Sequence, residues 1–318
     1  MQNEYVFTTD PVTVDNLVEL SRLQSVLDER RVCELHEAAI SLTDGILEYY
    51  ESGMNVYELL SLLSGGIDLG SGEVHRYALK ENISRLNGYL AAASSLDRTV
   101  FCELLLRSLR ERDIVIGEVD FLPSSSASET FVYVRNAYAD EAYDVFSQDF
   151  RDPRVTYARD FKDAVGRVVD GSVTYALLPL EERGGNRIQT VAQLIFANEL
   201  KINSVTPVFG FDGNADMKYA IVSRHFTVPR RRQSDDRYLE IRLAQDASMT
   251  LAALLSVGEY FGHSLYRVSS ISFDTEDGAR QFYSIVLRDD GTDFTHLLVY
   301  LTLFTDSYTP VGMYKNLE

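Results

Sequence analysis

Apolar and polar residues alternate with two different periods along the chain, and the change of period divides it into three segments. From 14 to 50, apolar side chains recur every three or four positions, which is typical of amphipathic helices. Strand-forming residues do not cluster in this part of the chain. We therefore predict an all-helical domain at 1–121. Its helices are expected at 14–50, 56–63, 73–94 and 98–112.

The period changes after a Ser-rich polar stretch, 122–130, which we predict to be a linker. Short runs of strand formers then alternate with helical patterns of about ten residues, which is typical of βαβ units. The pattern predicts a central α/β domain at 131–228 with a mostly parallel sheet, in which any antiparallel strand would lie at the edge. Strands are expected at 130–134, 154–158, 173–179, 201–209 and 218–226, and helices at 140–150, 161–171 and 187–199.

A second polar stretch, 229–236, is predicted to be the linker to a third domain at 237–318. The order of patterns in this domain is β-α-β-β-α-β, which is the order of a ferredoxin-like α+β fold. Strands are expected at 238–244, 264–273, 280–289 and 308–316, and helices at 249–262 and 293–305. The chain as a whole is thus predicted to be a multi-domain protein.

The charge of the chain narrows the class of partner. Its 318 residues include 45% hydrophobic residues, which suits a globular protein, and the formal net charge is −18. Nucleic acids and anionic membranes both require a basic face, so we predict neither as a partner. The one basic cluster, Arg230 to Arg232, is followed by Asp235 and Asp236, which favours a solvated linker over a phosphate site.

Targeting, redox and metal signals are weak in this sequence. The first residues have neither a basic region nor an apolar core of a signal peptide, and no stretch reaches 18 uncharged apolar residues. Cys33 and Cys102 lie far apart in helical patterns, as expected for structural thiols in a reducing compartment. The five histidines are scattered without ligand spacing. We predict a cytoplasmic protein with neither metal nor cofactor.

The stretch from 171 to 190, GSVTYALLPLEERGGNRIQT, carries the strongest candidate for a binding site. An apolar run ends at Pro179, where we expect the strand to stop, and Glu181, Gly184 and Gly185 follow. A continuous apolar run is typical of a central parallel strand, and open α/β sheets bind ligands at the carboxyl ends of such strands. The alternative is that the glutamates only solvate a loop.

Asn186 extends this candidate site toward the next helix. The stretch GGNRIQT has the composition of an anion-binding turn before a helix, with Asn186 as the N-cap. An ordinary structural turn is the alternative.

Residues 130–318 resemble the prephenate dehydratases, in which an α/β dehydratase domain precedes an ACT regulatory domain. Pro179, Glu181 and Gly185 stand where the family has Pro, Glu and Gly in its Leu-Pro-Ile-Glu-Asn-Ser run. HSLYRVSSIS (263–272) and VGMYK (311–315) are similar to two ACT motifs. The resemblance implies a lobe like those of periplasmic binding proteins. It also implies a site for a small carboxylate or an aromatic amino acid at Glu181, Gly184, Gly185, Asn186 and Asn214.

The sequence departs from this family at its catalytic motifs. The glycine- and hydroxyl-rich opening motif reads FVYVRNAYA at 131–139, and the catalytic Thr-Arg-Phe is best matched by Met217, Lys218 and Tyr219. Met217 cannot donate the proton that would assist loss of hydroxide from prephenate. Glu181, Lys218 and Tyr219 are the only candidate catalytic residues. We therefore favour a non-catalytic sensing or regulatory protein of phenylalanine metabolism, with an active prephenate dehydratase as the alternative.

Two further expectations follow from the resemblance. An effector would bind at Asp246, Ser248, Leu251 and Ser270, and two copies would pair through 237–318 to form a homodimer. The alternative is a monomer in which the N-terminal helices cover the same surface. Those helices occupy the place of the chorismate mutase domain of bifunctional relatives, so they are either a degenerate domain of that kind or an unrelated module.

Overall fold

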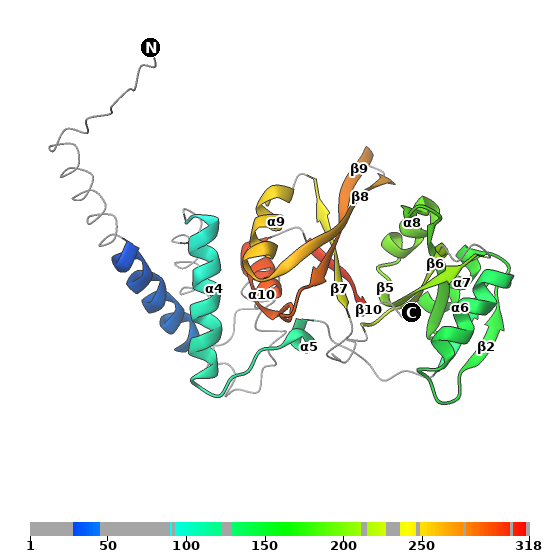
Figure 1. Cartoon of the computed structure of the whole chain (residues 1–318), viewed down its shortest axis with the longest axis horizontal. Coiled ribbons are helices and arrows are strands. Elements are labelled where there is room, and N and C mark those ends of the chain that lie inside the picture. Colours follow the sequence, from blue (N-terminus) through cyan, green and yellow to red (C-terminus); the bar gives the residue numbers. More distant parts are fainter. Residues whose placement is uncertain are drawn as a thin grey trace, which may run out of the picture. The chain divides into compact units, whose positions relative to one another are not determined.

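The computed structural model describes residues 28–44, 90, 93–121, 129–210, 215–226, 236–245, 249–275, 278–305 and 308–315. The described residues fall into two compact units, one up to Val115 and one from Ile116 onward (Figure 1). Asn214, Asp246, Ser248 and most of both predicted linkers lie outside the described residues. The predicted domain boundaries therefore stay predictions.

In the first unit the described residues are helical at 28–44 and in α4 (Ser95–Arg110). Ser94 caps α4, and its hydroxyl and the Asp97 carboxylate form a reciprocal capping box. Ion pairs between Arg31 and Asp97 (3.4 Å) and between Arg112 and Asp44 (2.6 Å) join the two helices. The helical prediction holds for this part of 1–121, and whether a full bundle forms is not tested.

The second unit is built on a single sheet of ten strands in the order β2-β1-β3-β6-β5-β10-β7-β9-β8, with β4 paired to β3. The strands are β1 (Thr130–Tyr133), β2 (Arg154–Tyr157), β3 (Tyr175–Glu182), β4 (Asn186–Arg187), β5 (Lys201–Phe209), β6 (Ala215–Ser223), β7 (Arg237–Ala244), β8 (His263–Thr275), β9 (Gly278–Asp289) and β10 (Tyr308–Lys315). The helices are α5 (Glu118–Phe121), α6 (Ala137–Ser147), α7 (Phe161–Val169), α8 (Gln189–Ala197), α9 (Leu251–Tyr260) and α10 (Thr295–Phe304).

The first half of this sheet is mixed, which corrects the prediction of a mostly parallel sheet. Strand β1 pairs in parallel with β2 and β3, whereas β6 runs antiparallel to both β3 and β5 and lies between them. The connection from β5 to β6 is short, and short connections join antiparallel neighbours. The antiparallel strand therefore lies inside the sheet rather than at an edge.

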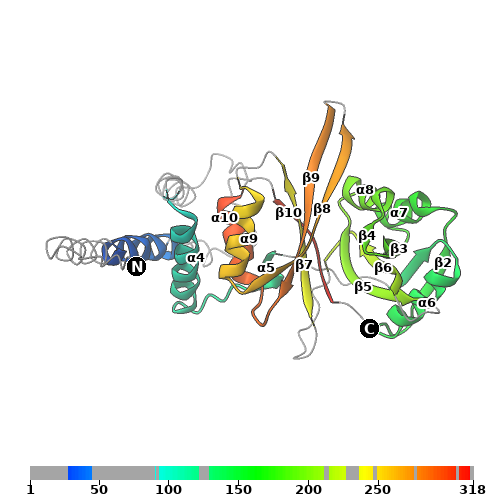
Figure 2. The same cartoon turned by 45° about the horizontal axis from the view of Figure 1, so that its top comes forward.

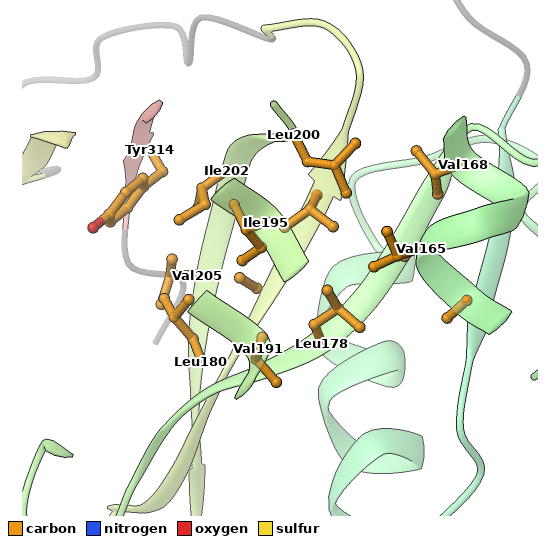
Figure 3. Close-up of a cluster of buried hydrophobic side chains, with 14 of the residues drawn as sticks. Val165, Val168, Leu178, Leu180, Val191, Ile195, Leu200, Ile202, Val205 and Tyr314 are labelled. Carbon is orange, nitrogen blue, oxygen red and sulfur yellow. The ribbon is translucent and has the colours of Figure 1, made fainter. Parts of the chain in front are cut away.

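Helices cover both faces of this half because side chains alternate along its strands. Phe131, Leu177 and Ile221 pack with α6 on one face. Their neighbours Val132, Leu178 and Val222 pack on the other face, with side chains of α7 and α8 such as Val165, Val191 and Ile195 (Figure 3). The alternation produces a three-layer core.

The second half has the predicted element order, β7-α9-β8-β9-α10-β10, and its strands are all antiparallel in the order β10-β7-β9-β8. Helices α9 and α10 lie on one side of these strands and α8 on the other (Figure 2). Gln189 and Gln193 of α8 donate hydrogen bonds to the carbonyl oxygens of Ser270 and Ser272 (3.4 and 3.0 Å). Part of β8, the terminal strand of this half, is therefore covered by α8 of the same chain.

The two halves join where β10 pairs in parallel with β5, at Gly312 and Ile202. A Cβ atom on Gly312 would lie 2.5 Å from the backbone oxygen of Ile202, closer than any side chain tolerates. Only glycine permits this approach. The sheet is therefore continuous because residue 312 has no side chain.

Within the described part of the chain, no helix combines the length and the apolar character that crossing a bilayer requires.

We predict that Gly312→Ala weakens the junction between β5 and β10. The added methyl group forces the two strands apart, which we expect to lower the free energy of unfolding by about 1–3 kcal/mol. Because the chain has no tryptophan, urea unfolding followed by far-ultraviolet circular dichroism is the suitable measurement. Gly166→Ala is the matched control, since a Cβ atom there meets nothing within 4 Å. An equal loss of stability in both variants would contradict the steric role of Gly312.

A buried histidine leads to a second prediction, which concerns how stability depends on pH. His263 begins β8, its ring stacks on Phe294 at a centroid distance of 4.4 Å, and within the described residues neither ring nitrogen has a hydrogen-bond partner. Burial lowers the pKa of His263 to about 4, although the charge of Asp289 acts in the opposite direction. The folded protein therefore holds this imidazole neutral where the unfolded chain would bind a proton.

Because the folded pKa of His263 lies below the unfolded value, its contribution to stability is full above the unfolded pKa and is lost as the pH falls toward 4. We expect about 3 kcal/mol of the free energy of unfolding to disappear between about pH 6.5 and 4 through this group. Urea unfolding at several pH values measures the slope, which we expect His263→Phe to reduce. The exposed His225→Gln serves as control, and an equal reduction there would refute the assignment.

Candidate functional site

Five charged side chains gather between β3, β4, β6, β7 and β8, and we call them the ionic cluster. Its members are Glu181, Arg187, Lys218, Glu240 and Arg267. Glu181 is only 5% exposed, and the side chains of Arg187 and Glu240 are 4% and 3% exposed. Charges this deeply buried require partners, because the loss of hydration costs several kcal/mol per ion.

Glu181 reaches the cluster through a break in strand alternation. Along β3, Leu177 faces α6 and Leu178 faces the opposite layer, so regular alternation would direct Glu181 toward α6. The pairing with β6 shifts between Pro179 and Glu181, and this bulge sets Glu181 opposite Lys218. Bulges re-aim side chains in this way. The Nζ atom of Lys218 lies 3.7 Å from Oε2 of Glu181.

The bulge also corrects the prediction that Pro179 ends the strand. Strand β3 continues through Pro179, which pairs with Tyr219, and ends at Glu182. Proline lacks the N–H group that a regular ladder needs, which accounts for the irregular pairing beside it.

The glycine turn is a β-hairpin, which also differs from the prediction. Glu181 pairs with Arg187 and Glu182 with Asn186 in antiparallel register, and Gly184 and Gly185 take positive φ angles of 87° and 80° in the turn. Asn186 does not cap α8, whose N-cap is Ile188, without a side-chain hydrogen bond. The hairpin instead places Arg187 directly beside Glu181.

Each carboxylate of the ionic cluster faces more than one cation or donor. Oε1 of Glu181 pairs with Nη1 of Arg267 and lies 3.8 Å from Nη1 of Arg187. Glu240 pairs with Nη2 of Arg187 and accepts hydrogen bonds from Ser284 (2.7 Å) and Tyr314 (3.1 Å). Burial, together with the charge of Glu240, raises the pKa of Tyr314 well above its ordinary value.

The cluster holds three cations and two carboxylates, and its excess positive charge lies on the accessible side. The side chains of Lys218 and Arg267 are 20% and 19% exposed, whereas the other members are almost fully buried. Nζ of Lys218 donates to the hydroxyl of Tyr266 (3.1 Å), whose ring is partly exposed. An anion arriving from this side would meet two partly neutralised cations and an aromatic ring.

The structure separates Tyr219 from the other candidate catalytic residues. Glu181 and Lys218 lie together, but Tyr219 follows Lys218 in β6 and therefore points to the opposite face, where its hydroxyl donates to Oδ1 of Asn136 (3.3 Å). Burial is the main cause that raises the pKa of Tyr219. Met217 packs against the same face as Tyr219.

Of the predicted effector residues, the structure describes two. Leu251 begins α9, and Ser270 lies in β8, where its carbonyl oxygen accepts from Gln189. Asp246 and Ser248 lie outside the described residues, so this predicted site is not tested.

Sequence reasoning missed Arg187, Glu240 and Arg267 as members of the cluster. Each lies in a short run whose apolar residues alone predict a helix or a strand. Glu240 alone carried a usable signal, since it lies between apolar residues in YLEIRLA, where a charged residue on a covered strand needs a partner. A search of the described residues finds no group of three His, Cys, Asp or Glu suited to hold a metal ion.

Comparisons with known proteins give matches among solved structures only. No protein-family model matches the sequence, and no curated protein matches it. Prephenate dehydratase from Streptococcus mutans is similar over 60% of this chain and 100% of its own, with 12% identity and a TM-score of 0.46. GqqA, described as a novel type of quorum quenching acylase, is similar over 59% of this chain and 96% of its own, with 19% identity and a TM-score of 0.44.

A third similar structure is prephenate dehydratase from Arthrobacter aurescens in complex with L-Phe. It covers 58% of this chain and 89% of its own, with 15% identity and a TM-score of 0.40.

Proposed function

We propose that this chain binds a small carboxylate or aromatic amino acid at the ionic cluster without converting it, and so acts as a sensing or regulatory protein. The observation that carries the proposal is the state of the residues at the family's catalytic positions. Lys218 is held by Glu181 and Tyr266, and Tyr219 points to the other face. The cluster has cations that can bind a carboxylate, but its five described members include no unengaged side chain to serve as a proton donor.

Dehydration of prephenate requires a proton donor where hydroxide leaves the ring. Among the described residues of the cluster, Lys218 and the two arginines each face a carboxylate, and Glu181 lies within ion-pair distance of all three cations. Tyr219, with a raised pKa, is a weaker acid than an ordinary tyrosine and lies on the wrong face. This arrangement favours binding over catalysis.

The accessible side of the cluster suits an amino acid in particular. A ligand carboxylate would pair with Arg267 and Lys218, and its ammonium group would face Glu181. The ring of Tyr266 offers a stacking surface and itself lies 4.8 Å from the ring of Tyr238. The two cations, the carboxylate of Glu181 and the ring of Tyr266 together favour an aromatic amino acid as the ligand.

The remaining parts of the proposal concern assembly. Residues 237–318 would form the ACT-like regulatory segment, and two copies would pair through it in the cytoplasm. Within the described sheet β8 is a terminal strand. Gln189 and Gln193 bind two of its carbonyl oxygens, and the rest of its edge would be available for pairing with another chain. Light scattering on the full chain tests this part, and a monomeric mass at tens of micromolar would contradict it.

We predict that the pure protein forms no phenylpyruvate from prephenate, because Met217 carries no proton to donate and Lys218, the remaining candidate donor, is held by Glu181 and Tyr266. Ultraviolet absorbance of phenylpyruvate in alkali measures the product. We expect isothermal titration calorimetry to detect binding of L-phenylalanine, phenylpyruvate or prephenate in the same preparation. Formation of phenylpyruvate at a rate proportional to protein would establish the alternative, an active prephenate dehydratase. Failure of all three ligands to bind would end the sensing proposal.

The cluster also predicts the effect of removing one cation. Arg267→Met removes the more exposed guanidinium, and we expect affinity for the ligand that binds to fall about 10–100-fold, the range of a charge-assisted hydrogen bond. Glu181 keeps Lys218 and Arg187 nearby, so the fold is expected to survive. Arg154→Met, on the exposed strand β2, is the charge-matched control. Equal affinities of Arg267→Met and wild type would place the ligand elsewhere.

A further inference from the structure

A small cavity lies on the inner side of the ionic cluster, where β5 meets β10. Its walls come from α8 and from β5, β7 and β10, and they include apolar side chains such as Ile195 and Ile202. Its volume is about 30 Å³, which corresponds to room for about two water molecules. The cavity therefore suits a very small ligand.

Two cations border this cavity from neighbouring positions. The Nζ atom of Lys201, at the start of β5, donates to the carbonyl oxygen of Pro310 (3.1 Å). Arg242 donates through Nη2 to Oγ1 of Thr309 (3.3 Å), and its guanidinium stacks on the ring of Phe196 at 3.6 Å. Because Thr309 and Pro310 are consecutive in β10, the two positive groups are anchored next to one another.

Neither of these cations is neutralised in the described part of the chain. Lys201 and Arg242 make no ion pair there, although Glu199 at the cavity wall acts on both from a distance. Burial, and then the charge of Arg242, lowers the pKa of Lys201, and burial also lowers the pKa of Arg242. Lys201 and Arg242 are both partly exposed, and two like charges held near one another are an unfavourable arrangement unless an anion accompanies them.

A third cation at the wall is incompletely satisfied. Arg187 lines the cavity with a side chain only 4% exposed, and its Nε and Nη1 atoms have no hydrogen-bond partner within the described residues. Buried N–H groups without acceptors are rare and cost about 1–3 kcal/mol each. Arg187 therefore has N–H groups that can still donate to a ligand, while its Nη2 atom is paired with Glu240.

We propose that this cavity binds one small monovalent anion, a halide or formate, between Lys201, Arg242 and Arg187. The three cations of the wall exceed its two carboxylates, Glu199 and Glu240, by one charge, which a single monovalent anion neutralises. The apolar part of the wall lowers the local dielectric constant and so strengthens the attraction. The proposal does not rest on the sensing role, since the anion occupies the inner side of Arg187 and the sensing ligand approaches Arg267.

The experiment compares thermal unfolding in three sodium salts at one ionic strength. Chloride and formate fit the cavity, and gluconate provides the same screening but is too large to enter. When chloride or formate exceeds its dissociation constant tenfold, we expect Tm to exceed the gluconate value by about 3–6 °C. Chloride and formate are separate arms, so the response of each identifies which anion is preferred.

Lys201→Met removes one of the proposed ligands with little change of volume. We expect the difference in Tm between chloride and gluconate to fall to less than a third of the wild-type value. Lys162→Met, at an exposed position on α7, removes the same charge elsewhere and is expected to retain the full difference. A difference that persists in Lys201→Met would overturn the proposal.

Crystals of the wild-type protein soaked in sodium bromide give a readout that does not depend on the folding of any variant. We expect an anomalous peak within contact distance of Nζ of Lys201 and the guanidinium of Arg242. Only water density in the cavity, together with equal Tm values in the three salts, would show that the cavity is simply hydrated and would refute the anion site.

Discussion

The close approach of β10 to β5 at Gly312 is the constraint on which the second unit of this protein depends. Without a side chain at this position, the backbone of β10 reaches Ile202 and one sheet runs through both halves. The same contact brings β7 and its Glu240 to Arg187, which lies on the hairpin of the other half. The buried charges and the small cavity both exist because this junction forms.

Burying charged groups at a junction is expensive unless each finds a partner of opposite sign. Glu240 meets this requirement through Arg187, Ser284 and Tyr314, and Glu181 through Arg267 and Lys218. Residues from both halves thus complete one another, so a wrong register at the junction would leave a buried charge unpaired. The ionic cluster therefore contributes to the specificity of the junction as well as to a binding surface.

The local charge around Arg187 and the net charge of the chain have opposite signs. The chain carries −18, yet both sides of Arg187 have an excess of cations over carboxylates. A strongly negative net charge disfavours large polyanionic partners, because they contact a whole face of a protein. A small anion senses only the groups within a few ångströms, so an acidic protein can present two cationic sites.

The local elements of the second unit could be predicted from the sequence alone, because they follow from periodicity over a few residues. The strand expected at 201–209 matches β5, and the β-α-β-β-α-β order of the last 82 positions, 237–318, is the one observed. The site was predicted only in part. Glu181 and Lys218 were singled out from their place in motifs, and the structure places them opposite one another.

Features that depend on pairing between distant strands could be seen only in the folded structure. Alternation cannot show that β6 lies inside the sheet, that a bulge beside Pro179 turns Glu181 around, or that Tyr219 faces away from Lys218. Arg187, Glu240 and Arg267 come from three strands that are remote in sequence, and the local pattern of each run does not indicate which residue its charge will meet. Partners of buried charges are chosen by strand order and register, and these are set by long-range contacts such as that of Gly312 with Ile202.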